Sequence, residues 1–396
     1  MDPARFQDSP AGRLLKIEQG ATSYWAFIPH PLPPQILLDS EFVRALSDAD
    51  RALGELAGLG RAMPNPDLLI GPFLRREAVL SSRIEGTQTD MEQLYAFEAG
   101  QLSLPGMKAA PPASDTREVM NYVEAQKYGL ERIKTLPVSL RLIRELHERL
   151  MHGVRDETET PGEFRRMQNF IGSHEVAIKD ATFIPPPVHE MHPALDSFEK
   201  YLHEGNELPP LVRLALIHYQ FEAIHPFLDG NGRIGRLLIS LLLVHWNLLP
   251  LPLLYLSAYF ERHRQQYYNL LLAVSERGVW REWIMFFLKG VAEQSKDALV
   301  RTKQVQDLQA DWRQRLTQAR ASALSLRLAD SLFESPIITI PRAQQLLNVK
   351  TYHTAKLHVE KLAKAGILYN WEDAAEYDAS ITSKIFLALE ILRIRE

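Results

Sequence analysis

The residues best suited to chemistry lie in one stretch of twelve, His225–Arg236 (HPFLDGNGRIGR). Its glycines permit a loop whose successive backbone N–H groups converge on an anion, and the positive end of a following helix would strengthen that site. Arg233 and Arg236 stand three positions apart, so on a helix both would face the same anion. The segment therefore predicts a phosphate-binding loop.

Two further side chains of this loop suit transfer of a nucleotide phosphate. Asp229 offers a carboxylate oxygen of the kind that binds Mg²⁺ next to phosphates. His225 carries the one side chain here whose ordinary pKa suits accepting a hydroxyl proton near neutral pH. The loop thus predicts a nucleotide-phosphate transfer site with Mg²⁺ as its metal.

Two familiar glycine motifs also match this loop but fail on context. Positions 230, 232 and 235 satisfy GxGxxG, and 230–236 resembles a P-loop with arginine in place of lysine. Both motifs require a strand before the glycines, whereas residues 211–224 are apolar at helical spacing. Leu237 also stands where a P-loop has its metal-binding Ser or Thr.

The elements that must position the loop are mostly helices. Helical periodicity is predicted over residues 40–60, 67–98, 117–130, 139–151, 192–203, 210–224 and 232–246. The exceptions are a proline-rich arm over residues 1–40 and a short hairpin at Glu175–Ile184, which Pro185-Pro186-Pro187 would end. The loop therefore joins the end of one helix to the start of the next.

Composition shifts suggest four units along the chain. Residues 1–115 form an N-terminal arm with helices, 116–290 a catalytic core, 291–334 a helical connector, and 335–396 a winged-helix-like domain. The last assignment rests on two short helices around the turn at 348–350, followed by an extended segment.

The loop resembles the motif of the Fic (filamentation induced by cAMP) family, HPFx(D/E)GNGRxxR, and matches it at every defined position. Residues 161–165 resemble the family's GxxR element, 183–186 the end of its flap, and Tyr267-Tyr268 its paired tyrosines. The resemblance covers about residues 30–290. It implies a mainly α fold, a Fic-type helical core with a short β-hairpin flap, and adds a C-terminal winged helix as in many bacterial members.

The resemblance implies a protein adenylyltransferase, which moves AMP from ATP to a Ser, Thr or Tyr hydroxyl of a protein target, or of itself, and releases pyrophosphate. His225 would be the general base, Asp229 the Mg²⁺ ligand, and the flap would hold the target as an added strand. The implied nucleotide contacts are Gly230, Asn231, Gly232, Arg233, Ile234, Gly235, Arg236, Thr182, Phe183 and Tyr268.

A second motif lies far upstream. Ser81–Gly86 (SSRIEG) resembles the family's inhibitory (S/T)xxxE(G/N) helix. The resemblance implies that Glu85 pairs bidentately with Arg236 and denies it to the ATP γ-phosphate. Without the family, Glu85 would be interpreted as a solvated surface charge. A third interpretation, removal of AMP by water positioned through Glu85, stays open.

Composition bounds the remaining interpretations. The 396 residues include 45 Lys and Arg, 49 Asp and Glu and no cysteine, so the net charge is −4. This excludes disulfides and disfavours binding dominated by a polyanion or a membrane surface. Pro250 and Pro252 divide the uncharged stretch 237–260 into a buried helix, a turn and a second apolar segment. With no signal-peptide pattern at the start, we expect a cytoplasmic protein.

Two other functions compete with that of the enzyme. His218, Glu222 and His225 share one helical face and could bind zinc, but Pro226 ends the helix at the last of them. The C-terminal unit could bind DNA, yet residues 325–396 hold nine basic and nine acidic residues, so DNA is less favoured than protein interaction. A homo-oligomer stays open.

Overall fold

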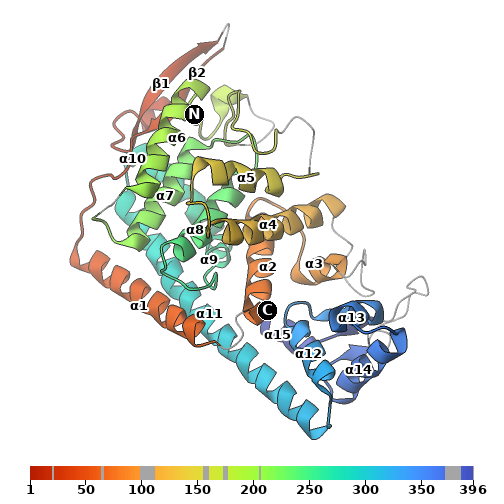
Figure 1. The fold of residues 1–396 in the computed structure, drawn as a ribbon. Coiled ribbons are helices and arrows are strands. Elements are labelled where there is room, and N and C mark those ends of the chain that lie inside the picture. Colours follow the sequence, from red (N-terminus) through yellow and green to blue (C-terminus); the bar gives the residue numbers. More distant parts are fainter. Residues whose placement is uncertain are drawn as a thin grey trace.

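Helices dominate the computed structural model of this protein, which describes residues 1–19, 22–63, 67–98, 112–154, 160–172, 177–204, 207–370 and 385–395 (Figure 1). The mainly α fold class predicted from periodicity is confirmed. The elements up to the glycine loop at residues 225–230 are β1 (Gly12–Gln19), β2 (Thr22–Pro29), α1 (Ser40–Ala62), α2 (Asp67–Ile84), α3 (Met91–Glu98), α4 (Ala113–Arg132), α5 (Leu140–Leu150), α6 (Val188–His203) and α7 (Pro210–Ile224). Those beyond it are α8 (Asn231–His245), α9 (Ser257–Arg262), α10 (Arg264–Arg277), α11 (Trp280–Gln318), α12 (Ala323–Leu332), β3 (Ile337–Thr339), α13 (Ile340–Leu347), α14 (Tyr352–Lys364), β4 (Tyr369–Asn370), β5 (Ile385–Leu387) and α15 (Leu389–Arg395).

The hairpin of α7 and α8 forms the centre of the core. Both helices are buried almost all round, mostly through apolar side chains, with a few buried polar and charged residues among them. Helix α7 packs on α6, α10 and α11, and α8 packs on α4 and α5. The indole N–H of Trp283 on α11 donates to the carbonyl of Ala215 on α7 across 2.9 Å. This packing fixes the ends of α7 and α8, and so fixes the loop between them.

Helix α2 crosses this core and delivers the second motif to the loop. It packs on α4, α8 and α9, and it ends at Ile84. Gly86 then takes a φ of 104°, a left-handed conformation that glycine adopts without strain. The chain therefore turns away directly after Glu85, which leaves that carboxylate at the end of the helix.

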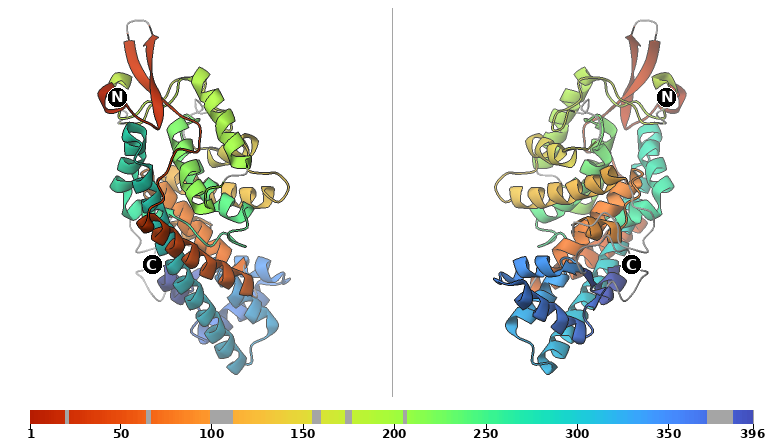
Figure 2. Two further views of the ribbon diagram at one scale, coloured as in Figure 1. Left: turned by 90° about the vertical axis from the view of Figure 1, so that its left-hand side faces the viewer. Right: turned by 90° about the vertical axis from the view of Figure 1, so that its right-hand side faces the viewer.

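The proline-rich arm contains a hairpin that the sequence analysis missed. Strands β1 and β2 pair antiparallel from Gly12 opposite Pro29 to Gln19 opposite Thr22, and they project from the helical body (Figure 2). At their base, the ring of Phe27 packs 5.7 Å from Phe6 and 5.8 Å from Phe183. Pro3 and Pro10 precede β1, and the other four prolines of the arm begin only at Pro29, the last residue of β2, so no proline interrupts either strand.

The hairpin predicted at Glu175–Ile184 is wrong for the part that can be assessed. Residues 173–176 lie outside the described part of the chain. Residues 178–180 form a 3-10 turn, and the described residues 177–184 contain only an isolated antiparallel bridge of Phe183 with Ile171. The following prolines 185–187 lack N–H groups and cannot extend this pairing into a ladder.

The C-terminal part joins the core through one continuous helix. Helix α11 runs for 39 residues, so it passes the predicted boundary at 290 without interruption. Beyond it lie α12 to α15 and a three-stranded sheet in the order β3-β5-β4. Residues 371–384, where a wing would fall, lie outside the described residues, so the winged helix stays a prediction.

The apolar stretch 237–260 follows the interpretation given above. Helix α8 ends at His245, residues 248–256 are irregular, and α9 begins at Ser257. In the described part of the chain, we find no helix with the length and apolar character needed to cross a membrane.

Candidate active site

Hydrogen bonds from its own side chains hold the shape of the loop predicted to bind phosphate. His225 ends α7 with a φ of 49° and Gly230 precedes α8 with a φ of 77°. The amide of Asn231 donates to the carbonyl of Phe227 and accepts from its backbone N–H, both at 2.9 Å. The Asn231 side chain therefore shapes the loop, while its backbone N–H is one of those at the start of α8 that could meet an anion.

The imidazole of His225 is oriented by a main-chain contact. Its Nδ1 lies 3.2 Å from the carbonyl oxygen of Glu222, which can only accept a hydrogen bond. Nδ1 therefore carries the proton, and Nε2 keeps its lone pair. Burial lowers the pKa of His225 to about 4, so the ring is neutral at pH 7. The geometry suits a proton acceptor at Nε2.

Arg165 fixes the backbone around His225. Its Nε donates to the carbonyl of His225 at 2.9 Å, Nη1 donates to Met167 at 3.2 Å, and Nη2 donates to the carbonyl of Pro186. Its side chain is buried, and burial lowers its pKa to about 10. Among the described residues, no carboxylate acts on the charge of Arg165, whose pKa responds to burial and to Tyr24. Arg165 is therefore a structural tie between the loop and the segment before α6.

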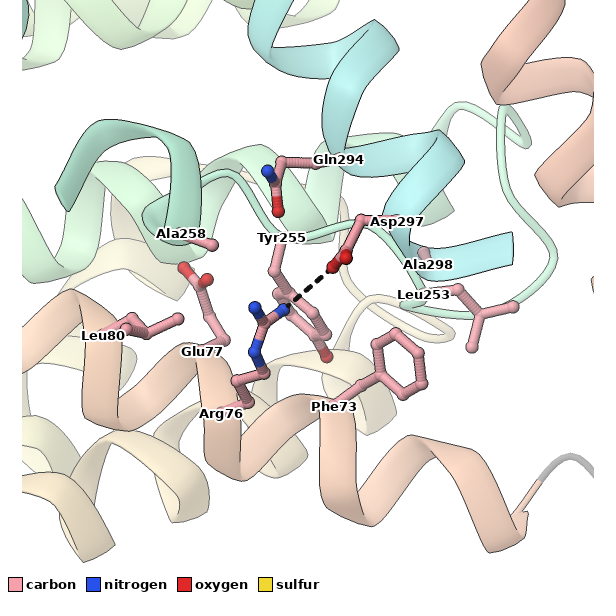
Figure 3. Close-up of a pocket in the computed structure, with 10 residues that line it drawn as sticks. All are labelled: Phe73, Arg76, Glu77, Leu80, Leu253, Tyr255, Ala258, Gln294, Asp297 and Ala298. Carbon is pink, nitrogen blue, oxygen red and sulfur yellow. Dashed lines mark hydrogen bonds and ion pairs between the residues drawn. The ribbon is translucent and has the colours of Figure 1, made fainter. Parts of the chain in front are cut away.

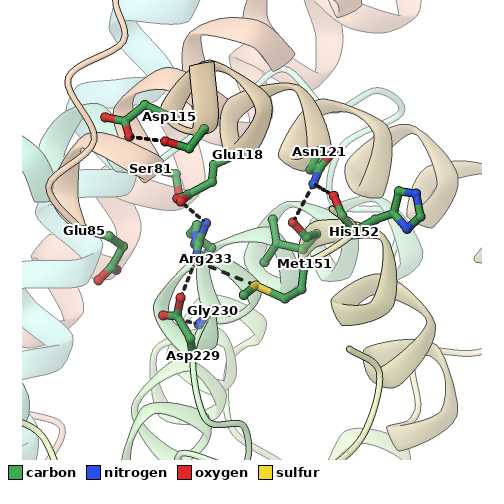
Figure 4. A network of polar contacts seen from close by, with 12 residues as sticks. Ser81, Glu85, Asp115, Glu118, Asn121, Met151, His152, Asp229, Gly230 and Arg233 are labelled. Atoms are coloured by element: carbon green, nitrogen blue, oxygen red, sulfur yellow. Dashed lines mark hydrogen bonds and ion pairs between the residues drawn. The ribbon is translucent and has the colours of Figure 1, made fainter. Parts of the chain in front are cut away.

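Arg233 is engaged away from the expected anion (Figure 4). Its Nη1 donates to Glu118 at 2.8 Å, and its Nη2 donates to Asp229 at 3.2 Å. The side chains of Arg233 and Glu118 are each only 2% exposed. The prediction that Arg233 and Arg236 face one anion is therefore corrected: the Arg233 guanidinium holds α4 and the loop together.

Arg236 is held by the motif on α2. Its Nε donates to the hydroxyl of Ser81 at 2.8 Å, and its Nη2 donates to the carbonyl of Ser81 at 3.0 Å. The same Nη2 donates to Oε1 of Glu85 at 2.7 Å. The structure thus brings Ser81 and Glu85 to Arg236, which lies more than 150 positions farther along the chain. The ion pair of Glu85 with Arg236 joins one nitrogen to one oxygen, whereas a bidentate pair was predicted.

A buried polar group lies behind Arg236. His218 hydrogen-bonds the hydroxyl of Tyr267 at 2.8 Å, and burial raises the pKa of Glu222 to about 8. A β-carbon on Gly235 would collide with the carboxylate of Glu222. Within the described ranges, no three His, Cys, Asp or Glu side chains are placed to hold a metal ion, so the zinc interpretation of His218, Glu222 and His225 is not supported.

The remaining predicted nucleotide contacts, Tyr268, Thr182, Phe183 and Ile234, divide into exposed and buried side chains. Tyr268 is 37% exposed, donates to the carbonyl of Ile84 at 3.3 Å and lies under the guanidinium of Arg264. Thr182 is exposed as well. Phe183 is buried among aromatic rings, and Ile234 is fully buried, so both side chains belong to the core. Their roles as nucleotide contacts stay predictions.

Asp229 is the residue that fits a magnesium ion. Its side chain is 33% exposed, accepts the N–H of Gly230 at 2.7 Å and pairs with Arg233. A single carboxylate suffices when substrate phosphates and water complete the octahedron. Asp229 therefore has the chemistry to fit this metal, and the same carboxylate also braces the loop through Gly230 and Arg233.

A small pocket lies along α2 on the side of α9 and α11, and the twelve loop residues do not line it (Figure 3). Its walls include Arg76 and Asp297, which form an ion pair at 3.3 Å, and Glu77, whose pKa is raised by burial. With a volume of about 10 Å³ it has room for roughly one water molecule. It is too small to be a nucleotide site.

Two residues that shape the site were not predicted from the sequence. Glu118 on α4 pairs with Arg233, and His147 on α5 contacts the loop directly. Both sit in helical stretches whose apolar periodicity predicts only packing. The signal available in the sequence was a charged or polar residue on or beside the helix face that the apolar spacing marks as buried.

Comparisons with known proteins place the loop in a family. Residues 43–131 match the Fic/DOC family N-terminal domain, and residues 137–243 match the Fic/DOC family domain. Proteins named Protein adenylyltransferase Fic from Drosophila grimshawi and Drosophila mojavensis are 30% and 31% identical over 206 residues. Those alignments cover 51% of this chain, which spans only 38% and 37% of the relatives' lengths.

Two solved structures share the fold. A Fic family protein from Desulfovibrio desulfuricans matches with a TM-score of 0.54 and 20% identity, over 90% of this chain and 98% of that one. Fic-1 from C. elegans (residues 134–508) matches with a TM-score of 0.52 and 21% identity, over 67% and 75%. The first match extends beyond the catalytic loop into the C-terminal part.

Proposed function

Because this chain belongs to the Fic/DOC family, we propose that it is a protein adenylyltransferase. It transfers AMP from ATP to a Ser, Thr or Tyr hydroxyl of a protein target and releases pyrophosphate. The names of the Drosophila relatives support this activity. The free Nε2 lone pair of His225, beside the glycine loop, is the observation that carries it.

In the proposed reaction, the target hydroxyl loses its proton to Nε2 of His225 as its oxygen attacks the α-phosphorus. The bond from that phosphorus to the bridging oxygen breaks, and pyrophosphate leaves with the electron pair. The low pKa of His225 would rise once phosphates lie near the ring, because an adjacent negative charge favours imidazolium. ATP is the proposed nucleotide, since the chemistry requires an adenylyl group.

Backbone N–H groups of residues 230–232 at the start of α8, which begins at Asn231, are proposed to hold the phosphates. Asp229 would hold Mg²⁺, which supplies positive charge to the phosphates when bound. Tyr268 and Thr182, both exposed, are the proposed adenosine contacts. Arg236 is proposed to bind the γ-phosphate when its guanidinium is released.

We further propose that the enzyme inhibits itself. Arg236 donates to Ser81 and Glu85, and these contacts occupy the face of the guanidinium that a γ-phosphate would need. ATP would then bind with its α-phosphorus out of line with the incoming hydroxyl. A misplacement of about 1 Å can cost on the order of 10²-fold in rate.

A second candidate activity is hydrolysis of the AMP group from a modified protein. Glu85 is 35% exposed at the edge of the site, so its carboxylate could position a water molecule. Adenylylation and hydrolysis would then use the same loop with different nucleophiles.

The absence of cysteine supports a cytoplasmic location, and the balanced charge of residues 325–396 favours a protein partner over DNA for the C-terminal part.

One experiment tests the proposed activity. The purified protein, both wild type and Glu85→Gly, is incubated with ATP labelled at the α-phosphate and, separately, at the γ-phosphate. Covalent label from the α-position alone supports adenylylation. Label from the γ-position alone would identify a kinase, and no covalent label from either would reject the proposed function.

A further inference from the structure

His147 contacts the catalytic loop from a different helix. It lies on α5, its residue is 3% exposed, and its ring is parallel to that of Phe227, with an angle of 3° and 3.7 Å between centroids. Phe227 is fully buried and also packs against Phe164 at 5.3 Å. The imidazole is therefore one wall of the slot that holds the phenylalanine of the loop.

The hydrogen bonds of His147 define its tautomer. The backbone N–H of Gly162 donates to Nδ1 at 2.9 Å, so Nδ1 carries no proton. Nε2 lies 3.1 Å from the carbonyl oxygen of Asp229, so Nε2 carries the proton and donates it there. Burial lowers the pKa of His147 to about 4, in keeping with a neutral ring at pH 7. One imidazole thus joins α5, residue 162 and the loop.

The contact with Asp229 matters because a peptide unit is planar. Its carbonyl points opposite to the N–H of the next residue, so directing the Asp229 carbonyl toward His147 turns the N–H of Gly230 to the other side. On that side the Gly230 N–H donates to the Asp229 carboxylate at 2.7 Å. The orientation of one peptide plane therefore sets both the carboxylate proposed for Mg²⁺ and the first N–H group of the loop.

We propose that His147 is a positioning residue for the reaction: it locks the peptide plane between Asp229 and Gly230 and thereby presets the metal ligand and the phosphate-binding N–H groups. This inference rests on the proposed function of the same loop. His147 itself is too buried to touch substrate, so it acts only through its contacts with Phe227 and Asp229.

The test uses three variants in the Glu85→Gly background. His147→Phe keeps a flat ring against Phe227 but removes both hydrogen bonds. His147→Gln restores an N–H donor that can reach the Asp229 carbonyl. Leu146→Ala is the matched control, because Leu146 is fully buried on the same helix but faces Gly129 on α4. The control should lower the melting temperature without moving the loop.

Each variant is assayed for α-label transfer across Mg²⁺ concentrations, for melting temperature, and for Mg²⁺-dependent ATP binding by calorimetry. We expect His147→Phe to lower kcat by about 10- to 100-fold and to raise the Mg²⁺ concentration at half-maximal binding, with the KM for ATP changing less. His147→Gln should recover a large part of both losses. Leu146→Ala should move neither, despite its lower melting temperature.

Two outcomes would overturn the inference: His147→Phe matching Leu146→Ala in kcat and in Mg²⁺ dependence, or nitrogen NMR shifts of the wild type showing the proton on Nδ1 of His147. Failure of the proposed function is distinguishable from either. If Glu85→Gly transfers no label at all, adenylylation is rejected, while the tautomer and the calorimetric Mg²⁺ dependence still decide the role of His147.

Discussion

Gly232 and Glu85 lie so close that a β-carbon at position 232 would collide with Oε1 of the glutamate and stand 2.9 Å from Nη1 of Arg236. The glycine therefore has two reasons to be there. One is the approach of a phosphate to the loop backbone. The other is the contact of Glu85 with Arg236, proposed above to be inhibitory, which a β-carbon at position 232 would push aside.

This relationship predicts an interaction between two substitutions. Gly232→Ala should destabilise the wild type by about 1 kcal/mol, the low end for added volume at a tight contact, because the groups it meets are the ends of the Glu85 and Arg236 side chains and can shift apart. In the Glu85→Gly background the same substitution should cost clearly less, since one of the two colliding groups is absent. Chemical denaturation of the four proteins in the cycle measures this coupling. Equal costs in the two backgrounds would show that the carboxylate does not occupy this position in solution.

Glu85→Gly alone should raise adenylylation. Arg236 would lose the acceptor at 2.7 Å and become available to the γ-phosphate, while Ser81 still orients it. Since a small misplacement can cost on the order of 10²-fold, a gain of that order is expected. Label transfer from α-labelled ATP to the protein itself provides the measurement.

The other interpretations of Glu85 give different results in the same assay. A solvated surface glutamate predicts an unchanged rate. A glutamate that positions water predicts slower release of AMP from a modified target in Glu85→Gly. Glu41, an exposed acid near the start of α1, provides a matched control, and Glu41→Gly should leave transfer unchanged.

His225→Ala should retain ATP binding but lose transfer by about 10²- to 10⁴-fold, the usual contribution of a general base. Because Arg165 and Asn169 hold the backbone carbonyl of residue 225, the loop should survive the loss of the ring. Calorimetry and label transfer on the same preparation separate the two effects. Transfer at the rate of the parent protein would remove His225 from the mechanism.

The pH profile provides an independent check of His225. Burial lowers its pKa to about 4, so the ring stays neutral as pH falls from 7 to 5. The acidic limb of kcat/KM, which reports the free enzyme, should therefore lie well below the ordinary histidine value of about 6.5. A midpoint near 6.5 would contradict the buried environment described above.

Asp229→Asn should weaken Mg²⁺-dependent ATP binding with a small effect on stability. Asparagine keeps an oxygen that can accept the Gly230 N–H, but it removes the charge that suits the metal. Asp229→Ala should also lower the melting temperature, since the carboxylate pairs with Arg233 as well. Calorimetry with and without Mg²⁺ tests the claim. If the wild type binds ATP equally in both conditions, Asp229 is not a metal ligand.

Glu222 gives a prediction for stability against pH. Burial raises its pKa to about 8, while an unfolded glutamate titrates near 4.5. Between these values the folded protein keeps a proton that the unfolded chain releases, so the free energy of unfolding falls as pH rises through this window. Glu222→Gln removes this dependence, and its stability relative to the wild type should rise from pH 5 to pH 8. A constant difference across this range would contradict the raised pKa.

The sequence alone was sufficient for the two helices that flank the loop, α7 and α8, and for the loop itself, whereas α9 and α10 were not predicted. The apolar spacing in α7 and α8 predicts that both helices are buried, and the glycines of residues 230–235 permit the tight loop between them. The upstream Ser81 and Glu85 could be linked to Arg236 only through the family resemblance. Their separation in sequence carries no periodic signal of contact.

Other features depend on tertiary packing and could not be predicted. Arg233 looks equivalent to Arg236 on a helical wheel, yet the buried Glu118 on α4 holds it elsewhere. Phe183 precedes a run of prolines, as a flap residue would, but its ring completes an aromatic cluster with Phe6 and Phe27. In each case the deciding partner comes from a helix or strand distant in the chain.

Helix α11 has a consequence for how the molecule unfolds. At 1.5 Å per residue it is about 59 Å long, and it belongs to both parts of the protein without a linker. Near the start of the helix, the indole N–H of Trp283 donates a hydrogen bond to α7. Farther along, the indole N–H of Trp312 donates to the carboxylate of Glu390 on α15. The C-terminal part cannot melt without fraying a helix that the core depends on. Calorimetry should therefore record one cooperative transition for the whole chain rather than two separate ones.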